Sequence, residues 1–316
     1  MNVTTDQHFM QEALNEAWRY QLLTYPNPAV GALIVKDAEA IACEAHKKSG
    51  EAHAEVNALR AAYLVQYPHC ELKNIHDSNL VHQYLLQHHN GYFHDCTIYV
   101  TLEPCNHIGK TPSCAMLLKE LRPKKIVVGS YDPNKEASGG MLTLKNQNID
   151  LSIGILQDKC DDLLLPFKLW QKKQFIFFKM AMRLDGTIGG GKISSQQSLT
   201  WVHQLRTCID VMLIGGNTVR TDRPTLDSRF VKGKAPNILI YSKQKEFDQR
   251  IPLFSIANRD VIISDTLEVV QDKNFVMVEG GYALLNSMQN AIDMLVLIVS
   301  NSEKKRITNK NLGLEE

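Results

Sequence analysis

Two short stretches decide the fold and chemistry that we expect of this chain: His53-Ala-Glu55, and Thr101-Leu-Glu-Pro-Cys105-Asn-His-Ile-Gly-Lys-Thr-Pro-Ser-Cys114. They offer one imidazole, two thiols, and a carboxylate two residues from the imidazole. A catalytic zinc ion takes three protein ligands and keeps its fourth position for water. We therefore expect His53, Cys105 and Cys114 to bind zinc, and Glu55 to carry protons without contacting the metal.

The order of these residues is informative in itself. A His-x-Glu followed by a Pro-Cys and a second Cys is the signature of zinc nucleobase deaminases. The alternative is a set of buried structural cysteines beside a surface histidine, because a free cysteine packs like a small hydrophobic residue. That alternative leaves the order, the Pro-Cys pair and the His-x-Glu to coincidence, so we favour the deaminase site.

Length and composition describe an ordinary globular protein. The chain has 316 residues, of which 44% are hydrophobic and 22% charged, with a net charge of +1, so we expect two domains. Nucleic-acid binding depends on clustered Lys and Arg, and no long basic run occurs, so we expect no nucleic-acid partner. The N-terminus lacks a signal-peptide pattern, and no apolar run is long enough to span a membrane. We expect a cytoplasmic protein with no membrane contact, whose seven cysteines are reduced.

The first half alternates helices and strands. Helical spacing of apolar residues predicts helices at 6–23, 53–65, 137–146 and 158–173. Apolar runs predict strands at 29–35, 39–45 (antiparallel to the first), 97–101, 125–129 and 151–155. Such alternation implies a sheet with helices on its faces, and we place the domain boundary near residue 172.

The predicted elements place the candidate zinc ligands at one sheet edge. Cys105 follows a strand, and Cys114 opens a helix whose positive end lowers a thiol pKa. Glu55 falls in the first turn of the helix at 53–65, where the helix dipole favours an ionised carboxylate.

Residues 66–95 differ in composition from their surroundings. We favour a solvated insertion with a short helix around Leu80–Leu86 over a second metal site, although His-rich tracts can bind metal. The segment holds six of the eleven histidines of the chain, namely His69, His76, His82, His88, His89 and His94.

Three motifs make the first half more specific: Tyr25-Pro-Asn-Pro-Ala-Val-Gly31, Gly50-Glu-Ala-His-Ala-Glu-Val56, and the stretch from Thr101 to Cys114. Together they resemble the bifunctional deaminase–reductase family of riboflavin biosynthesis. Eight residues separate Cys105 from Cys114, whereas transfer-RNA, guanine and many cytosine deaminases have a two-residue gap. The long gap therefore points to the riboflavin branch.

The resemblance implies an α/β protein with a cytidine-deaminase-like α/β/α domain over residues 1–172 and a dihydrofolate-reductase-like α/β domain over residues 173–316. It implies that the first domain deaminates 2,5-diamino-6-ribosylamino-4(3H)-pyrimidinone 5′-phosphate hydrolytically, with Zn²⁺ as cofactor and Glu55 as proton carrier. Residues that line the substrate pocket in the family match Asn27, His46, His107 and Lys110.

The second half shows strand-like runs at 175–182, 211–214, 237–241, 260–263, 275–278 and 294–300, and a helical pattern at 195–208. Three motifs resemble the reductase domain of the same family: Lys-x5-Asp-Gly from Lys179, Gly-x-Thr-Val-x-x-Asp from Gly216 to Asp222, and Val-Glu-Gly-Gly at 278–281. The implied reaction is hydride transfer from NADPH that converts a ribosyl into a ribityl chain.

Several further positions match functional residues of that reductase domain. Lys179 and Asp222 match its catalytic positions, and we assign cofactor binding to Thr218, Gly280 and Gly281. A glycine pair between a strand and a helix lets the backbone approach a phosphate closely, and arginines suit a phosphate because guanidinium pairs with it in a bidentate way. The positions that match substrate contacts are Ser194, Arg206, Thr225, Arg229 and Glu279.

The second half also departs from the family pattern. Lys192 stands where Trp is usual, and Arg223 follows Asp222, where it would be able to pair with that carboxylate and reorient it. The family continues with further strands that this domain is expected to lack, so the reductase domain is C-terminally short. An alternative is therefore a deaminase with an inactive reductase-like scaffold domain.

A non-catalytic zinc module that binds nucleic acid is the alternative from a different class. A closed structural zinc site needs a fourth ligand, which only the His-rich segment is able to supply, and it has no need of Glu55. The balanced charge also argues against this alternative. We expect a homo-oligomeric enzyme that acts on a small-molecule pyrimidine ribotide.

Overall fold

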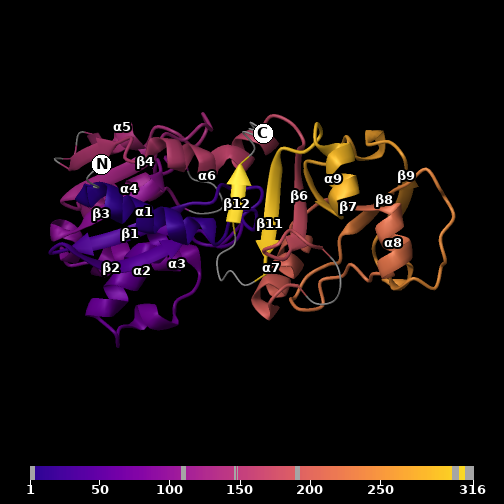
Figure 1. Cartoon of the computed structure of the whole chain (residues 1–316). Helices are drawn as coiled ribbons and strands as arrows, with labels where there is room; N and C mark the ends of the chain where they lie inside the picture. Colours follow the sequence, from indigo (N-terminus) through magenta and orange to yellow (C-terminus); the bar gives the residue numbers. More distant parts are fainter. Residues whose placement is uncertain are drawn as a thin grey trace. The chain divides into compact units, whose positions relative to one another are not determined.

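The computed structural model describes residues 4–107, 112–145, 147, 149–188, 193–300 and the strand at 306–309. The chain divides into two compact units, Met1–Lys168 and Leu169–Glu316, whose elements are labelled in Figure 1. Each unit is built on one sheet with helices, which confirms the α/β class. Within the described ranges, no helix is long and apolar enough to cross a membrane.

The first unit contains a five-stranded sheet in the order β2-β1-β3-β4-β5. Strand β1 pairs antiparallel with β2 and with β3, and the strands from β3 to β5 are parallel. The predicted antiparallel pairing of the first two strands is therefore confirmed. The strands are β1 (Gly31–Lys36), β2 (Glu39–Ala45), β3 (Thr97–Leu102), β4 (Lys125–Ser130) and β5 (Asp150–Ile153).

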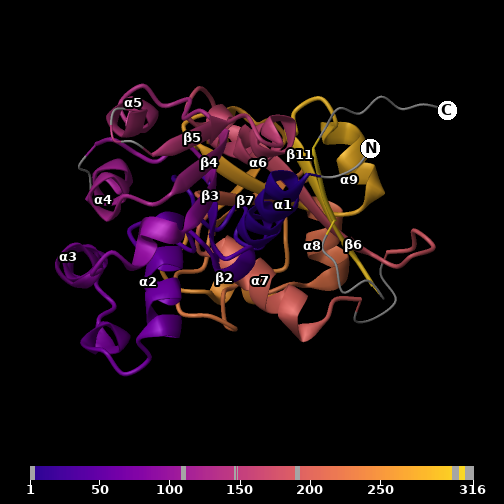
Figure 2. The same cartoon turned by 90° about the vertical axis from the view of Figure 1, so that its left-hand side faces the viewer.

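Helices cover both faces of this sheet because its strands are apolar on both sides. Successive strand residues point to opposite faces, and in β1 Leu33 joins the cluster around α1 whereas Ile34 joins the cluster around α2. Figure 2 shows α1 and α2 on either side of the strands. The helices are α1 (Thr5–Trp18), α2 (Ala54–Gln66), α4 (Cys114–Leu121), α5 (Gly140–Lys145) and α6 (Gln157–Trp170).

Residues 67–96, which we call the α2–β3 segment, connect α2 to β3. This segment contains η1 (Glu71–Asn74), α3 (Ser78–His88) and η2 (Tyr92–Asp95). The predicted short helix is confirmed, and much of the segment is exposed as expected, but one face of it is buried. Apolar side chains from all three elements are buried in one core cluster with α2 and α4, because the segment carries its own apolar face: Leu72, Val81, Leu85 and Phe93.

The second unit contains a seven-stranded sheet in the order β12-β11-β6-β10-β7-β8-β9. Its strands are parallel except for β12, which runs antiparallel to β11 at one edge. The sequence analysis expected no strand beyond β11, so β12 corrects it. The strands are β6 (Phe175–Met182), β7 (Val211–Gly215), β8 (Asn237–Tyr241), β9 (Val261–Ser264), β10 (Phe275–Glu279), β11 (Met294–Val299) and β12 (Arg306–Asn309).

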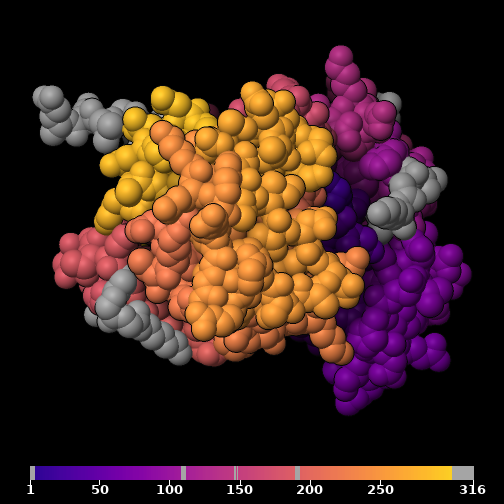
Figure 3. Space-filling view, turned by 90° about the vertical axis from the view of Figure 1, so that its right-hand side faces the viewer, coloured from indigo at the N-terminus to yellow at the C-terminus, as the bar shows by residue number. Residues whose placement is uncertain are grey.

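Three α-helices and two short 3₁₀ turns complete the described part of the second unit. The segment that carries β8, β9 and α9 lies at the surface on the face shown in Figure 3. Buried residues of β6, β7, β8 and β10 pack together with Met288 of α9. The elements are α7 (Gln196–Arg206), α8 (Gly216–Asp222), α9 (Tyr282–Met288), η3 (Pro252–Ser255) and η4 (Glu268–Val270).

Candidate active sites

The structure brings His53, Cys105 and Cys114 together at the carboxyl end of β3. His53 is the N-cap residue of α2, and Cys114 is the first residue of α4. One ligand atom from each lies within 4.8 Å of the others, and His53 Nδ1 is 3.6 Å from Cys105 Sγ and 3.4 Å from Cys114 Sγ. A tetrahedral zinc ion about 2.3 Å from sulfur and about 2.0 Å from nitrogen separates such atoms by about 3.5 Å. The three residues therefore fit a zinc ion that His53 would bind through Nδ1.

Ser113 closes the loop between the two cysteines. Its Oγ accepts a hydrogen bond from Met116 N (3.2 Å), which caps α4, and donates to the Cys105 carbonyl (2.9 Å). The Cys105 carbonyl also accepts from Ala115 N at 3.1 Å, and Cys105 Sγ accepts from Cys114 N at 3.5 Å. Three of these hydrogen bonds thus join the two ends of the loop and hold both thiols in place.

The two thiols differ in acidity because they interact with each other. The hydrogen bond from Cys114 lowers the pKa of Cys105, and the neighbouring His53 acts in the same direction, against the effect of burial. The same bond, together with burial, raises the pKa of Cys114. Because zinc takes thiolates as ligands, the lowered pKa of Cys105 favours the form that the metal requires, and Cys114 would lose its proton on binding.

Glu55 lies in the first turn of α2, as predicted, and is only 4% exposed. Burial raises the pKa of Glu55 to about 7, and the field of His53 opposes this shift. The expectation that the helix dipole would favour the ionised form was therefore wrong in its net effect, because desolvation penalises the carboxylate more strongly. Glu55 does not belong to the metal-ligating group.

His46 and Asn27 form a fixed pair beside the metal group. His46 is buried, its ring makes an edge contact with the His53 ring at 5.5 Å, and its Nδ1 donates to the Ala52 carbonyl at 3.1 Å. Nε2 therefore accepts from Asn27 Nδ2 at 3.1 Å, and burial lowers the pKa of His46 to about 4. His46 is thus neutral and orients the Asn27 amide. His107 is exposed in the loop after Cys105, and Lys110 lies outside the described residues.

Glu103 is a structural residue of this site that the sequence analysis did not identify. It directly follows β3 and is 5% exposed, and its carboxylate accepts three backbone hydrogen bonds. Oε1 accepts from Gly139 N (3.0 Å) and Met141 N (3.1 Å), and Oε2 accepts from Asp132 N (3.2 Å). The carboxylate therefore anchors the β4–α5 loop next to Cys105. An acidic residue directly after a buried strand was the available signal.

Glu103→Gln is expected to destabilise the first unit by about 2 kcal/mol, because hydrogen bonds to a buried charged group contribute about 1.5–3 kcal/mol and an amide has only one accepting oxygen. The fall in its unfolding temperature checks this. Glu136→Gln, which alters an exposed carboxylate in the same loop, is the control. Equal unfolding temperatures for both variants would contradict the anchoring role.

The α2–β3 segment does not supply a fourth ligand within the described part of the chain. The group formed by His53, Cys105 and Cys114 is the one metal-ligating cluster among the described residues. His82, the one buried histidine of the segment, instead lies with Nε2 at 3.4 Å from the Ser113 carbonyl. Three protein ligands and an open fourth position characterise catalytic zinc sites, so this geometry favours the catalytic interpretation over a structural zinc module.

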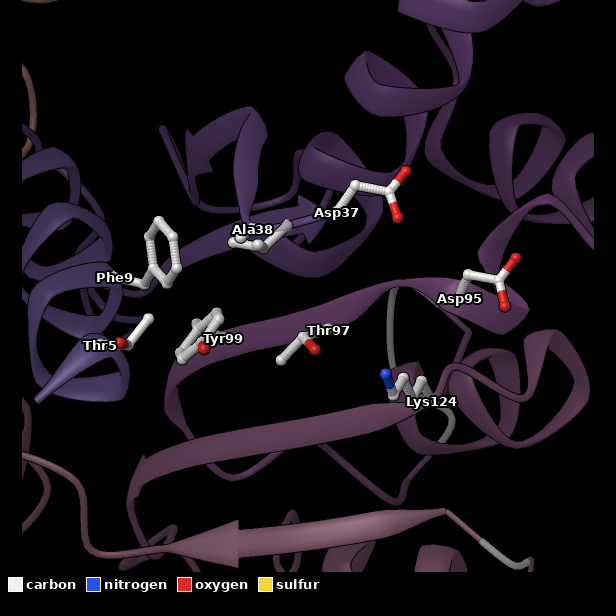
Figure 4. Close-up of a pocket in the computed structure, with 9 residues that line it drawn as sticks. Thr5, Phe9, Asp37, Ala38, Asp95, Thr97, Tyr99 and Lys124 are labelled. Carbon is white, nitrogen blue, oxygen red and sulfur yellow. The ribbon is translucent and has the colours of Figure 1, made fainter.

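A cavity of about 330 Å³ lies at the other end of β3. Figure 4 shows the Phe9 and Tyr99 rings on one side of it and the charged groups of Asp37, Asp95 and Lys124 on the other. Its β3 residue Thr97 begins the strand, whereas Cys105 follows the strand's end. The cavity is therefore separate from the metal group.

In the second unit, three predicted site residues form a partly buried charge cluster. Glu279 ends β10 and is paired in register with Lys179 on the neighbouring parallel strand β6. Lys179 Nζ lies 3.1 Å from Glu279 Oε1, and Arg206 Nη2, from α7, lies 3.2 Å from Glu279 Oε2. Burial opposes ionisation of Glu279, but the charges of Lys179 and Arg206 lower its pKa to about 2. The cluster is therefore fully charged.

Arg223 does not take the partner that the sequence suggested. Its guanidinium lies 2.9 Å from Asp248 Oδ2, a carboxylate that also binds Arg250. Asp222 is exposed at the end of α8, and its Oδ1 accepts from the Thr221 hydroxyl at 3.0 Å. The expected reorientation of Asp222 by Arg223 was wrong, because Arg223 adopts a left-handed conformation (φ 44°) that ends the helix.

The remaining predicted residues lie on several elements of the second unit. Arg229 is exposed and pairs with Asp227 at 2.8 Å, and the Thr225 carbonyl accepts from Arg259 at 2.8 Å. Thr218 is half-buried in α8, and Ser194 is half-buried just before α7. Gly280 and Gly281 link β10 to α9, where added side chains would crowd Leu284 and Ile188.

Two known domain families match this chain. Residues 3–130 match the cytidine and deoxycytidylate deaminase zinc-binding region, and residues 174–300 match the RibD C-terminal domain.

Proteins and structures with similarity over most of the chain carry both domains. The riboflavin biosynthesis protein RibD of Actinobacillus pleuropneumoniae is 32% identical over 84% of this chain and 67% of its own length. RibD of Synechocystis is 32% identical over 76% of this chain, and the match spans only 60% of that relative. A solved structure from Thermotoga maritima, a diaminohydroxyphosphoribosylaminopyrimidine deaminase/5-amino-6-(5-phosphoribosylamino)uracil reductase, is 26% identical with a TM-score of 0.64, covering 94% of this chain and 87% of that one.

Proposed function

This chain belongs to the RibD family of riboflavin biosynthesis proteins, and from that premise we propose that it catalyses two consecutive reactions on one pyrimidine ribotide. Residues 1–172 deaminate 2,5-diamino-6-ribosylamino-4(3H)-pyrimidinone 5′-phosphate. Residues 173–316 then reduce the ribosyl group of the product to a ribityl chain with NADPH. Both activities are those that the Thermotoga maritima relative is named for.

The observation that carries the deaminase proposal is a buried acid beside a three-ligand metal group. His53 and the two cysteines are spaced for one tetrahedral ion. Zinc held there would act as a Lewis acid that makes a bound water nucleophilic near neutral pH.

Glu55 performs the proton transfers in this proposal. It takes a proton from the water that adds to the amine-bearing ring carbon and passes one to the ring nitrogen. It then takes the proton of the newly added hydroxyl group and gives it to the amino group, so that the carbon–nitrogen bond breaks, ammonia leaves and the hydroxyl oxygen becomes a ring carbonyl. A carboxyl group whose pKa is about 7 is able both to accept and to release a proton at neutral pH.

Neighbouring residues would bind the pyrimidine ribotide. The neutral His46 ring holds the Asn27 amide in one orientation, so that amide is able to read a pyrimidine edge by hydrogen bonding. We assign His107 and Lys110 to the same substrate.

The charge cluster of the second unit supports the reductase proposal. Glu279 orients the Lys179 ammonium group, and a cation in that position would stabilise an oxygen that gains negative charge when the ribosyl ring opens. We assign Asp222 to catalysis, Thr218, Gly280 and Gly281 to NADPH, and the substrate contacts to Ser194, Arg206, Thr225, Arg229 and Glu279.

One experiment tests both proposed activities. The full chain, loaded with zinc, receives the diaminopyrimidine ribotide and excess NADPH, and ammonia release and NADPH absorbance are followed together. We expect ammonia with a matching fall in NADPH. Ammonia without NADPH loss would leave a deaminase with a scaffold domain, and the absence of both signals would overturn the riboflavin assignment.

A further inference from the structure

We propose that the α2–β3 segment supports the metal site, and that His82 is the residue through which it positions Cys114. This inference rests on the proposed zinc-dependent function and adds a role for a part of the chain that the catalytic proposal does not use. The sequence analysis weighed a second metal site against a solvated insertion. The described residues of the segment form no second metal group, and one face of the segment packs into the core.

His82 contacts the loop that presents Cys114. Because the Ser113 carbonyl is an acceptor, His82 Nε2 is the donor of their 3.4 Å hydrogen bond. Ser113 immediately precedes Cys114, and its hydroxyl binds the Cys105 carbonyl. His82 therefore contacts a residue that is next to Cys114 in the chain and is hydrogen-bonded to Cys105.

His82 differs from the other histidines of the segment in its place on α3. It is 7% exposed and shares a buried helix face with Ser78, Val81 and Leu85, a spacing of 78, 81, 82 and 85 that follows the helical repeat. His69, His76, His88 and His94 are exposed. A buried polar side chain needs a partner, and among the described residues the Ser113 carbonyl provides one for His82.

The same segment is tied to α2, which carries Glu55 and follows His53. The Arg60 guanidinium donates to the carbonyls of Leu72, Lys73 and Ile75 at 3.0–3.2 Å. In addition, Tyr63 Oη donates to the His88 carbonyl at 2.7 Å. The segment therefore contacts both helices whose first residues form the site.

This arrangement has a consequence for the metal. Cys105 and Cys114 are separated by eight residues, so the position of Cys114 depends on the contacts that hold the start of α4. Groups that orient metal ligands from behind change metal affinity by about 10- to 100-fold when they are removed. The Ser113 carbonyl also accepts from Leu117 N at 3.2 Å, so this carbonyl keeps one hydrogen-bond donor when His82 is replaced. We therefore expect a change in metal affinity at the lower end of that range, about tenfold.

The test measures zinc loss from the zinc-loaded full chain to an excess of a chromogenic chelator. His82→Phe keeps a ring but removes the donor, and we expect release about tenfold faster than from the unchanged protein. His82→Gln, whose amide nitrogen reaches the position of Nε2, is expected to restore slow release. His76→Gln, an exposed histidine of the same segment, is the matched control and is expected to change nothing.

The outcomes separate this inference from the proposed function. Slow release from His82→Phe, with or without a lower unfolding temperature, would show that His82 only packs and would overturn the inference. If His82→Phe fails to fold, His82→Asn takes its place in the test. Its shorter amide does not reach the Ser113 carbonyl, so we again expect faster zinc release. If the protein without substitutions binds no zinc, the proposed metal site is itself wrong.

Discussion

Glu55→Gln is expected to lower the rate of ammonia release by about 10²- to 10⁴-fold while the protein keeps its zinc. Glutamine fills the same buried volume, but its amide has no proton to exchange. Glu55 stands outside the group of metal-ligating atoms, so the metal should remain bound. Ammonia release with the diaminopyrimidine ribotide and the zinc content of the purified variant are the two measurements.

The matched control for this variant is Glu51→Gln, which alters an exposed carboxylate four residues earlier and should leave both quantities unchanged. Retained ammonia release in Glu55→Gln would place the proton transfer on another group. Loss of zinc from Glu55→Gln would make this carboxylate a ligand, which contradicts the geometry.

Lys179→Met is expected to slow substrate-dependent NADPH oxidation by about 10²- to 10³-fold and to leave ammonia release intact. Methionine has nearly the same length but no charge, so the oxygen that gains negative charge in the second reaction loses its stabilising cation. Glu279 would keep its ion pair with Arg206 at 3.2 Å, so its carboxylate would not be left without a positively charged partner. Both signals are read in the same cuvette.

Lys172→Met is the control for this second variant, since Lys172 is exposed just before β6. A fall in ammonia release in Lys179→Met would mean that the substitution acts through the stability of the whole chain, and its unfolding temperature would show this. Unchanged NADPH oxidation would remove Lys179 from the reaction.

The secondary structure and the deaminase motifs were predictable because they depend on local patterns. An apolar run predicted β1 with β2 as its antiparallel neighbour, and helical spacing predicted α2 beginning next to His53. The His-x-Glu and Pro-Cys motifs identified residues that the fold indeed brings within 4.8 Å. Zinc chemistry restricts the residue types and their order so strongly that the pattern is visible without coordinates.

The tertiary structure decided how charged and polar groups behave, because burial and long-range partners are not local properties. Near the metal group, desolvation sets the pKa of Glu55 at about 7 against the helix dipole. In the second unit, the pairing of β6 with β10 places Lys179 opposite Glu279. The left-handed backbone conformation of Arg223 directs its side chain to Asp248.

The α2–β3 segment shows the same division most clearly. The sequence does not distinguish the six histidines of this segment from one another. By itself it determined only that they are clustered and that a helix lies among them. Packing of α3 against α4 buried His82 beside Ser113 and left most of the others in water. The physical reason is that a side chain's role depends on the surface it packs against, which only the folded chain defines.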